Sequence, residues 1–491
     1  MMENYERALA VAFQQAQHAP METIDAALRL MGEAPEDPRS VFLMGEIMLR
    51  AQNPQLSYQL YRRCVEMAPQ SESAWNNLGK AAQELNRPDE AKGYFQKAID
   101  LVPDFDAALQ NMATVAMNEG RPEDALAICE KLTTGRFGQQ AMDVLGMCQL
   151  ALGQWDRGWA NFEHSLGNKY RKVKTYGENA ERWNGPDIRI PETVVDEYGY
   201  KDTEIFALEP SWSRDLIVYG EQGIGDEIFF GSIIPDLENC GQHVILDVDE
   251  RLAGLFHRSF PWAEVHGTRR DEIPGWYDPG KEYDWCAIGS LGAHYRRSEA
   301  SFPGTPYLKP DPLRTFQWQA TFKGVVKRSP VIGIAWTGGR IQTGHYDKSL
   351  KLEQLLPLFK AFPDAQFVSL EYQSRSGDVK RFANEHKVNL VHFRHATETD
   401  DHDNTAALVA ACDVVVSVMT SVAHLSAAMG KRTIMMMPTR VQPMWRYHNR
   451  PTSIPWYKSL RLCRQKNAGE WGPVIDEVIG LVKGEKDGAQ N

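Results

Sequence analysis

Asp215 to Leu237, DLIVYGEQGIGDEIFFGSIIPDL, is the stretch that sets the fold of the larger part of the chain. It opens with an apolar run of strand length, breaks into a loop with Gly220, Gly223 and Gly225, and resumes with apolar residues at helical spacing. Such a unit is typical of a parallel sheet covered by helices, in which ligands bind where strands pass into loops. The glycines by themselves fit a structural turn and a ligand loop equally well.

The composition is that of an ordinary globular protein, with 491 residues, 43% apolar and 24% charged. A chain of this length is too long to fold around a single hydrophobic core, so two or three domains are expected. The formal net charge of -11 disfavours a nucleic-acid partner, because phosphate attraction requires a basic face. No apolar run approaches membrane-spanning length, so we expect no membrane insertion.

The seven cysteines are an odd number, lie far apart and form no C-x-x-C pair. This usage indicates reduced thiols rather than disulfides or zinc ligands, and we expect no metal. The first residues, MMENYERALA, carry acidic groups where a signal peptide would have its positive and apolar regions. Both observations favour a cytoplasmic protein.

The first third of the chain repeats itself with a period of 34 residues. The clearest copy carries Trp75, Gly79 and Phe95 at the tetratricopeptide spacing, and Gly45 and Ala113 lie one period before and after Gly79. We therefore predict four to five helix pairs, in which small residues let paired helices approach and aromatic residues fill the gaps. Such arrays present a groove, and we expect a protein partner in it rather than a spacer or dimerisation arm.

Beyond the repeats, apolar strand-length runs alternate with helical patterns, which predicts parallel sheets flanked by helices. After the run that opens at Asp215, the expected strands lie at 243–248, 263–266, 285–292, 329–339, 366–370, 388–393, 414–418 and 433–437. The predicted class is α + α/β, an α-solenoid followed by two Rossmann-like halves. The predicted boundaries are 1–168 for the array, 169–210 for a connector, 211–313 for the first half, 314–328 for a linker, and 329–491 for the second half with a closing C-terminal helix.

Six short motifs in a fixed order point to a known group. They are GWANFE (158–163), RWNG (182–185), GEQGIGD (220–226), GIAWTGG (333–339), SVMTSVAHLSAAMGK (417–431) and PWYKSLRLCRQ (455–465). Together they resemble bacterial tetratricopeptide proteins whose C-terminal region is similar to the heptosyltransferases of glycosyltransferase family nine. The resemblance implies a GT-B architecture and transfer of a sugar from a nucleotide donor without a metal or other cofactor.

A glycosyl transfer requires a base for the acceptor hydroxyl and a group that stabilises the departing phosphates. Asp226 aligns with the aspartate that resembles the family's base, and Glu221 and Glu227 are the neighbouring alternatives. Gly223 and Gly225 belong to the same loop and are assigned with it to the donor-facing wall.

The donor phosphates are expected at the helix that opens at Thr420 and Ser421, because free N–H groups and the helix dipole favour an anion there. His424 follows one turn later, and Lys348 resembles the family's donor-phosphate lysine; Thr337, in the GIAWTGG motif, is assigned to the donor as well. On its residues alone this pattern fits an N-cap with a core histidine better, and the resemblance reverses that preference.

One position departs from the family pattern: Met419 stands where most relatives have an aspartate. A thioether cannot replace a carboxylate as an acceptor for a donor hydroxyl. Three alternatives remain open: the donor differs, Asp413 or Glu371 substitutes, or catalysis is lost. The segment 444–465 interleaves aromatic residues with arginines, and we expect it to line the cleft or to dock the last helix, 470–482, across the halves.

The function expected from these observations is glycosyl transfer from a nucleotide sugar to a protein that the repeats recruit, with Asp226 as base. A saccharide acceptor is the alternative within the enzyme class. A non-catalytic adaptor with a degenerate GT-B body is the alternative outside it, and Met419 favours that interpretation.

Overall fold

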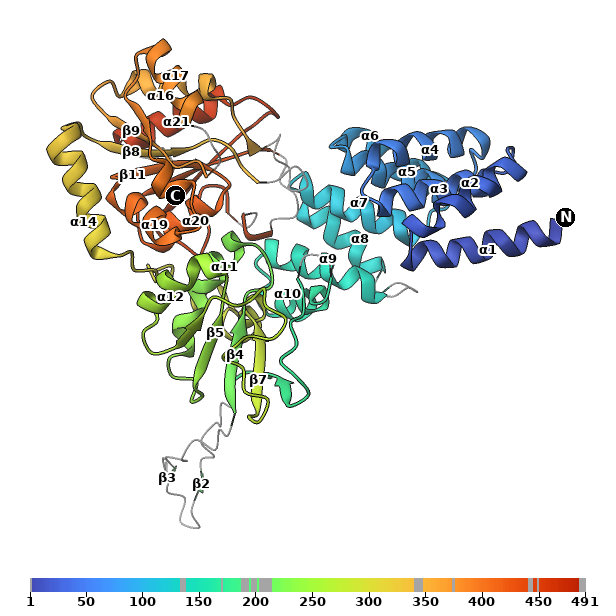
Figure 1. The fold of residues 1–491 in the computed structure, drawn as a ribbon, viewed down its shortest axis with the longest axis horizontal. Coiled ribbons are helices and arrows are strands. Elements are labelled where there is room, and N and C mark those ends of the chain that lie inside the picture. Colours follow the sequence, from blue (N-terminus) through green and yellow to red (C-terminus); the bar gives the residue numbers. More distant parts are fainter. Residues whose placement is uncertain are drawn as a thin grey trace. The chain divides into compact units, whose positions relative to one another are not determined.

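The computed structural model describes residues 2–132, 138–168, 171–186, 194–195, 201–202, 214–339, 348–372, 376–439, 445–447 and 450–484. The chain divides into two compact units, one built on residues 1–152 and one built on residues 153–441 and 446–491. The first unit is helical and the second holds two parallel sheets (Figure 1). None of the helices in the described ranges is long and apolar enough to cross a bilayer.

The first unit is an α-solenoid with the predicted period. Its helices are α1 (Met2–His18), α2 (Ile24–Glu33), α3 (Pro38–Arg50), α4 (Pro54–Met67), α5 (Glu72–Glu84), α6 (Pro88–Leu101), α7 (Asp106–Asn118), α8 (Pro122–Leu132) and α9 (Gly138–Ala151). Helices α3, α5 and α7 begin at residues 38, 72 and 106, and α4, α6 and α8 begin at 54, 88 and 122, so both members of each pair recur every 34 residues. The predicted tetratricopeptide solenoid is confirmed.

The small residues of the repeat have the predicted packing role. A Cβ at Gly79 would lie 2.4 Å from Cε1 of Phe95, whose side chain is fully buried. One period earlier, a Cβ at Gly45 would lie 3.0 Å from the ring of Tyr61. The paired helices therefore touch through a glycine and an aromatic ring, which fixes their separation.

The first half of the second unit is a five-stranded, all-parallel sheet of order β1-β7-β4-β5-β6. Its strands are β1 (Ala180–Arg182), β4 (Asp215–Tyr219), β5 (Val244–Asp247), β6 (Glu264–His266) and β7 (Tyr283–Ala287), and its helices include α11 (Ile224–Phe230), α12 (Ala253–Ser259) and α13 (Gly292–Tyr295). The chain runs from β4 outward to β5 and β6 and then returns to β7 on the other side. This reversal places a topological switch point between β4 and β7.

The segment that joins the repeats to β4 is part of this half over much of its length. Helix α10 (Trp155–Phe162) packs Trp159 against Gly292 so closely that a Cβ there would lie 2.5 Å from the indole. Trp159 Nε1 also donates to the carbonyl of Arg296 at 2.8 Å. Within the expected connector, 169–210, β1 pairs with β7, and a short β2 (Val194–Val195) pairs with β3 (Lys201–Asp202). Residues 169–170, 187–193, 196–200 and 203–210 of this connector lie outside the described residues.

The second half is a six-stranded parallel sheet of order β10-β9-β8-β11-β12-β13. Its strands are β8 (Val331–Ala335), β9 (Gln366–Ser369), β10 (Leu390–His392), β11 (Val414–Val418), β12 (Thr433–Met437) and β13 (Leu460–Arg464). Its helices are α14 (Pro312–Ala320), α16 (Leu356–Ala361), α17 (Ser376–His386), α18 (Arg394–Thr397), α19 (His402–Ala411), α20 (Ser421–Ala428) and α21 (Gly472–Lys483). Strand β13 was not expected, because its arginines interrupt the apolar run. Helix α14, which starts before the expected linker 314–328 and continues into it, packs on α19.

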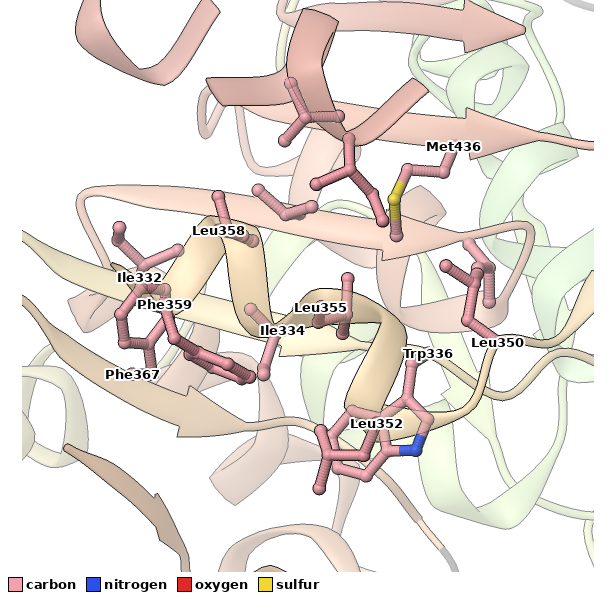
Figure 2. Close-up of a cluster of buried hydrophobic side chains, with 14 of the residues drawn as sticks. Ile332, Ile334, Trp336, Leu350, Leu352, Leu355, Leu358, Phe359, Phe367 and Met436 are labelled. Atoms are coloured by element: carbon pink, nitrogen blue, oxygen red, sulfur yellow. The ribbon is translucent and has the colours of Figure 1, made fainter. Parts of the chain in front are cut away.

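The sheet of the second half has a buried apolar cluster on each face, one of them covered by α16, α17 and α21 and the other by α14 and α19. Figure 2 shows Ile332 and Ile334 of β8 beside Phe367 of β9, covered by Leu358 and Phe359 of α16. All five side chains are at most 2% exposed. The predicted pair of Rossmann-like α/β halves behind a helical repeat region is confirmed, and the cores anchor the loops described next.

Candidate active site

Both sheets have a switch point, and the predicted site residues lie at the carboxyl ends of the strands that form it. In the second half, β8 lies between β9 and β11, so the switch point is bordered by the loop after Ala335 and the turn after Val418. In the first half, the loop after Tyr219 borders the corresponding point. In open α/β sheets these edges are where ligands bind.

The two edges meet at a glycine. A Cβ at Gly225 would lie 3.4 Å from Cα of Ser421, so the start of α11 touches the start of α20. Thr420 is the N-cap of α20 in an extended conformation, and its hydroxyl lies 3.0 Å from that of Ser417. The structure thus brings the loop of the predicted base and the helix predicted to hold the donor phosphates into contact. Free N–H groups at the start of α20 make this a suitable place for an anion.

Asp226 lies beside the contact between these helix starts. Its Oδ1 accepts from Nη2 of Arg446 at 2.6 Å, and its Oδ2 accepts from the N–H of Gly223 at 3.2 Å. The side chain remains 28% exposed, and the Arg446 guanidinium lies 4.3 Å from the ring centroid of Phe229. Asp226 is therefore a positioned, ion-paired carboxylate that stays partly exposed to solvent.

The two alternative carboxylates of the loop are buried and engaged elsewhere. Glu221 Oε1 accepts from Nε of Arg171 at 3.1 Å, and its side chain is fully buried. Glu227 forms an ion pair with Arg269 and accepts from the N–H of Asp249 at 2.9 Å. Burial raises the pKa of Glu227 to about 8. Neither side chain is accessible to solvent, which leaves Asp226 as the loop's accessible carboxylate.

Lys348 packs against the backbone of Gly338, the residue that follows Thr337. A Cβ at Gly338 would lie 3.1 Å from Cβ of Lys348 and 3.2 Å from the carbonyl oxygen of Met419. The loop that carries Thr337 is held by Glu371, which accepts from the N–H of Trp336 at 2.6 Å and from that of Thr337 at 2.8 Å.

Thr337 also donates its hydroxyl to the carboxylate of Glu371. Thr337 is 7% exposed and Lys348 is 1% exposed. The structure therefore places both residues beside the second half's switch point.

His424 lies behind the start of α20 in an aromatic cluster. Its Nε2 lies 2.7 Å from the hydroxyl of Tyr447 and its Nδ1 lies 3.3 Å from that of Tyr457. Burial, with a smaller effect from Arg446, lowers the pKa of His424 to about 3, so the ring is neutral at physiological pH. Both nitrogens engage tyrosines, which gives His424 a clear part in holding α20. Its assignment to the donor stays a prediction.

The structure narrows the alternatives for the carboxylate missing at Met419. Asp413 precedes β11 and accepts from the N–H of Val331 at 2.7 Å, so it lies at the amino end of the sheet. At about 3.3 Å per residue, the five residues of β11 put it roughly 16 Å from the switch point. Asp413 cannot substitute. Glu371 follows β9 and lies at the correct edge, where it holds the Thr337 loop.

Arg446 is the site residue that sequence reasoning did not single out. It belongs to the arginine- and aromatic-rich segment 444–465, whose first residue, Met444, lies outside the described residues. Trp456 of the same segment places its ring 4.1 Å from that of Phe229 on α11. The segment thus packs against the loop and the helix that carry Asp226. Helix α21 packs against α16, β12 and β13 of its own half, and its docking across the two halves stays a prediction.

A cavity in the second half adjoins Thr337. It encloses about 680 Å³ and is lined by Trp336, Thr337, Ser349, Arg381, Phe382 and Trp471, among others. A cavity of this size accommodates a nucleoside-sized ligand. No group of three or more metal-ligating side chains occurs in the part of the chain that the structure describes.

The fold combines a helical solenoid of tetratricopeptide type with two α/β halves that contact each other at Gly225 and Ser421. The tetratricopeptide repeat family model matches residues 73–105. Protein FlbA of Caulobacter vibrioides is 26% identical over 346 residues, which are 68% of this chain and 53% of that protein. The chain thus spans about half the length of this curated relative.

The comparison with solved structures gives matches of two kinds, both at low TM-scores. A thermophilic tetratricopeptide protein of Thermus thermophilus is 15% identical and covers 34% of this chain and 91% of its own, with a TM-score of 0.31. A mutant O-GlcNAc transferase of Thermobaculum terrenum is 14% identical and covers 98% of this chain and 90% of its own, with a TM-score of 0.33.

Proposed function

We propose that the protein is a glycosyltransferase of GT-B architecture that moves a sugar from a nucleotide-sugar donor to an acceptor hydroxyl. The observation that carries this proposal is the meeting of the two switch-point loops at Gly225 and Ser421, with the accessible carboxylate of Asp226 beside them. An enzyme that joins a donor and an acceptor requires such a convergence of a base with an anion-stabilising helix start. The family-nine resemblance of the motifs supports the same interpretation.

In the proposed reaction, Asp226 accepts the proton of the acceptor hydroxyl while the hydroxyl oxygen bonds to the donor's anomeric carbon. The bond from that carbon to the phosphate oxygen breaks, and a nucleoside diphosphate leaves. Charge on the leaving phosphates is stabilised by the start of α20 at Thr420 and Ser421 and by Lys348. The 680 Å³ cavity beside Thr337 takes the donor's nucleoside. As the resemblance implies, the proposal assigns no metal to this reaction.

Nucleotide binding provides the first test. A nucleoside diphosphate or nucleotide sugar present at about 100 times its Kd should stabilise the intact chain by about 2.7 kcal/mol, seen as a raised Tm. Lys348→Ala should weaken binding of the diphosphates, because it removes a cation from the phosphate side. If no nucleotide in a panel of uridine, guanosine, cytidine, adenosine and thymidine diphosphates raises the Tm, the proposal fails.

Transfer chemistry provides the second test. Asp226→Asn keeps the size of the side chain and can still accept from Arg446, so donor binding should survive while sugar transfer and donor hydrolysis collapse. Unchanged turnover in Asp226→Asn would remove this residue as base.

The repeat array is of a kind that binds proteins, and we propose that it recruits a protein acceptor. Deletion of residues 1–150 should then abolish modification of that acceptor and leave donor hydrolysis intact. Transfer that survives the deletion would favour a saccharide acceptor instead.

A non-catalytic adaptor is the second candidate. Met419 in place of a carboxylate favours it, as does the engagement of both Asp226 oxygens by protein donors. An adaptor would keep partner binding through its repeats and show no sugar transfer with any nucleotide sugar.

A further inference from the structure

The proposed reaction leaves unused the two motifs nearest the repeats, GWANFE and RWNG. The structure brings them together at one cavity in the first α/β half. Glu163 ends the first motif, and Arg182, Trp183 and Asn184 open the second; all four line this cavity. Its other walls come from the carboxyl end of β7 and the segment that follows, at Cys286, Ala287, Ser290, Ala293 and His294.

The cavity lies at the carboxyl edge of the first sheet. Strand β1 ends at Arg182 and its neighbour β7 ends at Ala287, and the N–H of Trp183 donates to the carbonyl of Trp285 at 2.9 Å. A crevice therefore opens where two adjacent parallel strands pass into loops. The cavity encloses about 200 Å³.

The polar wall is a connected network around Glu163. This carboxylate pairs with Arg182 and accepts from the hydroxyl of Ser290 at 2.8 Å. The buried Arg171 lies 3.3 Å from Glu163 on one side and 3.1 Å from Glu221 on the other. Because Glu221 belongs to the loop of the proposed base, the cavity wall and that loop share one guanidinium.

The RWNG motif shapes the opposite wall. The Trp183 indole contacts the His294 ring with centroids 4.9 Å apart and donates to Gln242 at 2.8 Å. Gly185 has a φ of +101°, and a Cβ there would lie 2.4 Å from Nδ1 of His294, so this position requires glycine. Burial lowers the pKa of His294, which keeps the ring neutral and able to both donate and accept.

The size and chemistry of the cavity define its occupant. The volume equals that of about seven waters and is below the roughly 300 Å³ of nucleotide-sized sites, which excludes the donor. The wall offers a carboxylate, a half-exposed guanidinium, an amide, a hydroxyl and an indole, and the charges of Glu163 and Arg182 cancel. This set suits a neutral ring with many hydroxyl groups.

We propose that this cavity is a binding site for a single sugar ring, built by the GWANFE and RWNG motifs. The site needs no nucleotide and stands apart from the proposed transfer reaction. If the chain binds a sugar but no nucleotide, this inference stands and the proposed glycosyl transfer is rejected.

The test uses the intact chain with D-glucose, D-mannose, L-rhamnose and N-acetyl-D-glucosamine at millimolar concentration, with no nucleotide, followed by saturation-transfer NMR. Ala293→Leu fills the cavity, and Arg182→Ala removes its guanidinium. Arg394→Ala is the matched control, because Arg394 is also an exposed arginine paired with a glutamate, and it belongs to the second half rather than to the cavity. The Tm of each variant checks its folding.

The expected result is saturable binding of at least one sugar to the parent chain and to Arg394→Ala. Binding should be lost in Ala293→Leu and weakened about tenfold in Arg182→Ala, as the loss of a charge-assisted hydrogen bond implies. If Ala293→Leu fails to fold, the sugar binding measured for Arg182→Ala alone decides the test. The inference is overturned if no sugar binds the parent chain or if binding persists unchanged in the folded cavity variants.

Discussion

Gly220 and Gly223 belong to one loop, and the structure predicts opposite tolerance to alanine at these positions. A Cβ at Gly220 would lie 2.3 Å from the carboxyl carbon of Glu227, whereas a Cβ at Gly223 would lie 3.3 Å from the nearest oxygen of Asp226. Gly220 does not adopt a positive φ, and Gly223 has φ -84° and ψ 165°. The backbone accepts alanine at both sites, so only the side-chain contact distinguishes them.

The cost at Gly220 follows from what Glu227 holds. Ordinary carbon contacts begin at about 3.5 Å, so Gly220→Ala must displace the Glu227 carboxyl by roughly 1 Å. That carboxyl pairs with Arg269 and accepts from the N–H of Asp249, and it is fully buried. Overpacking a buried site typically costs about 1 to 3 kcal/mol, and the displaced carboxyl also loses its hydrogen bond, so we expect about 3 kcal/mol of lost stability.

Gly223→Ala is the matched control in the same loop. The alanine side chain would meet the partly exposed carboxylate of Asp226, which can move aside. We therefore expect a loss of stability below about 1 kcal/mol. Differential scanning calorimetry of the intact chain measures both, because the second unit's transition should fall by several degrees in Gly220→Ala alone. Equal transition temperatures for the two variants would refute the packing argument.

Three further predictions concern other parts of the molecule. Gly79→Ala should destabilise the repeats because its Cβ would overlap Phe95. Gly93→Ala, whose Cβ would meet nothing within 4 Å, should stabilise them by about 0.5 to 1 kcal/mol. Thermal unfolding of the two variants shows whether each change in stability has the expected sign. The pKa of Glu227 is raised from 4.5 to about 8, so the folded chain should lose stability as the pH rises between these values, by at most about 1.4 kcal/mol per pH unit. Glu227→Gln should flatten the dependence of the unfolding free energy on pH in this window. An unchanged slope would contradict the raised pKa of Glu227. Arg446→Lys keeps the charge but loses the planar stacking, so turnover at saturating donor should fall roughly tenfold with little change in KM; equal rates would exclude a positioning role.

Local patterns predicted much of the fold before any contact was known. The 34-residue period follows from helix pairs that repeat the same packing, so α3, α5 and α7 begin where the sequence predicts. Apolar runs broken by glycine predicted both parallel sheets, because buried strands must be apolar along their length. The order of the strands also placed the GEQGIGD loop at a carboxyl edge.

The site's detailed chemistry depended on contacts between distant segments. Asp226 and Arg446 are 220 positions apart, and nothing in either local sequence encodes their ion pair. The same holds for Glu221, a candidate base by sequence that the fold assigns to Arg171.

Periodicity and turn chemistry are local properties, so the amino-acid sequence was enough to predict the repeat array, the two α/β halves and Asp226 as a candidate. Three findings required the folded chain. They are which carboxylate of the 220–227 loop stays exposed, the position of Asp413 at the amino end of the second sheet, and the cavity that GWANFE and RWNG share. These outcomes depend on which strands become neighbours and on how side chains compete for burial. Both are properties of the packed chain as a whole.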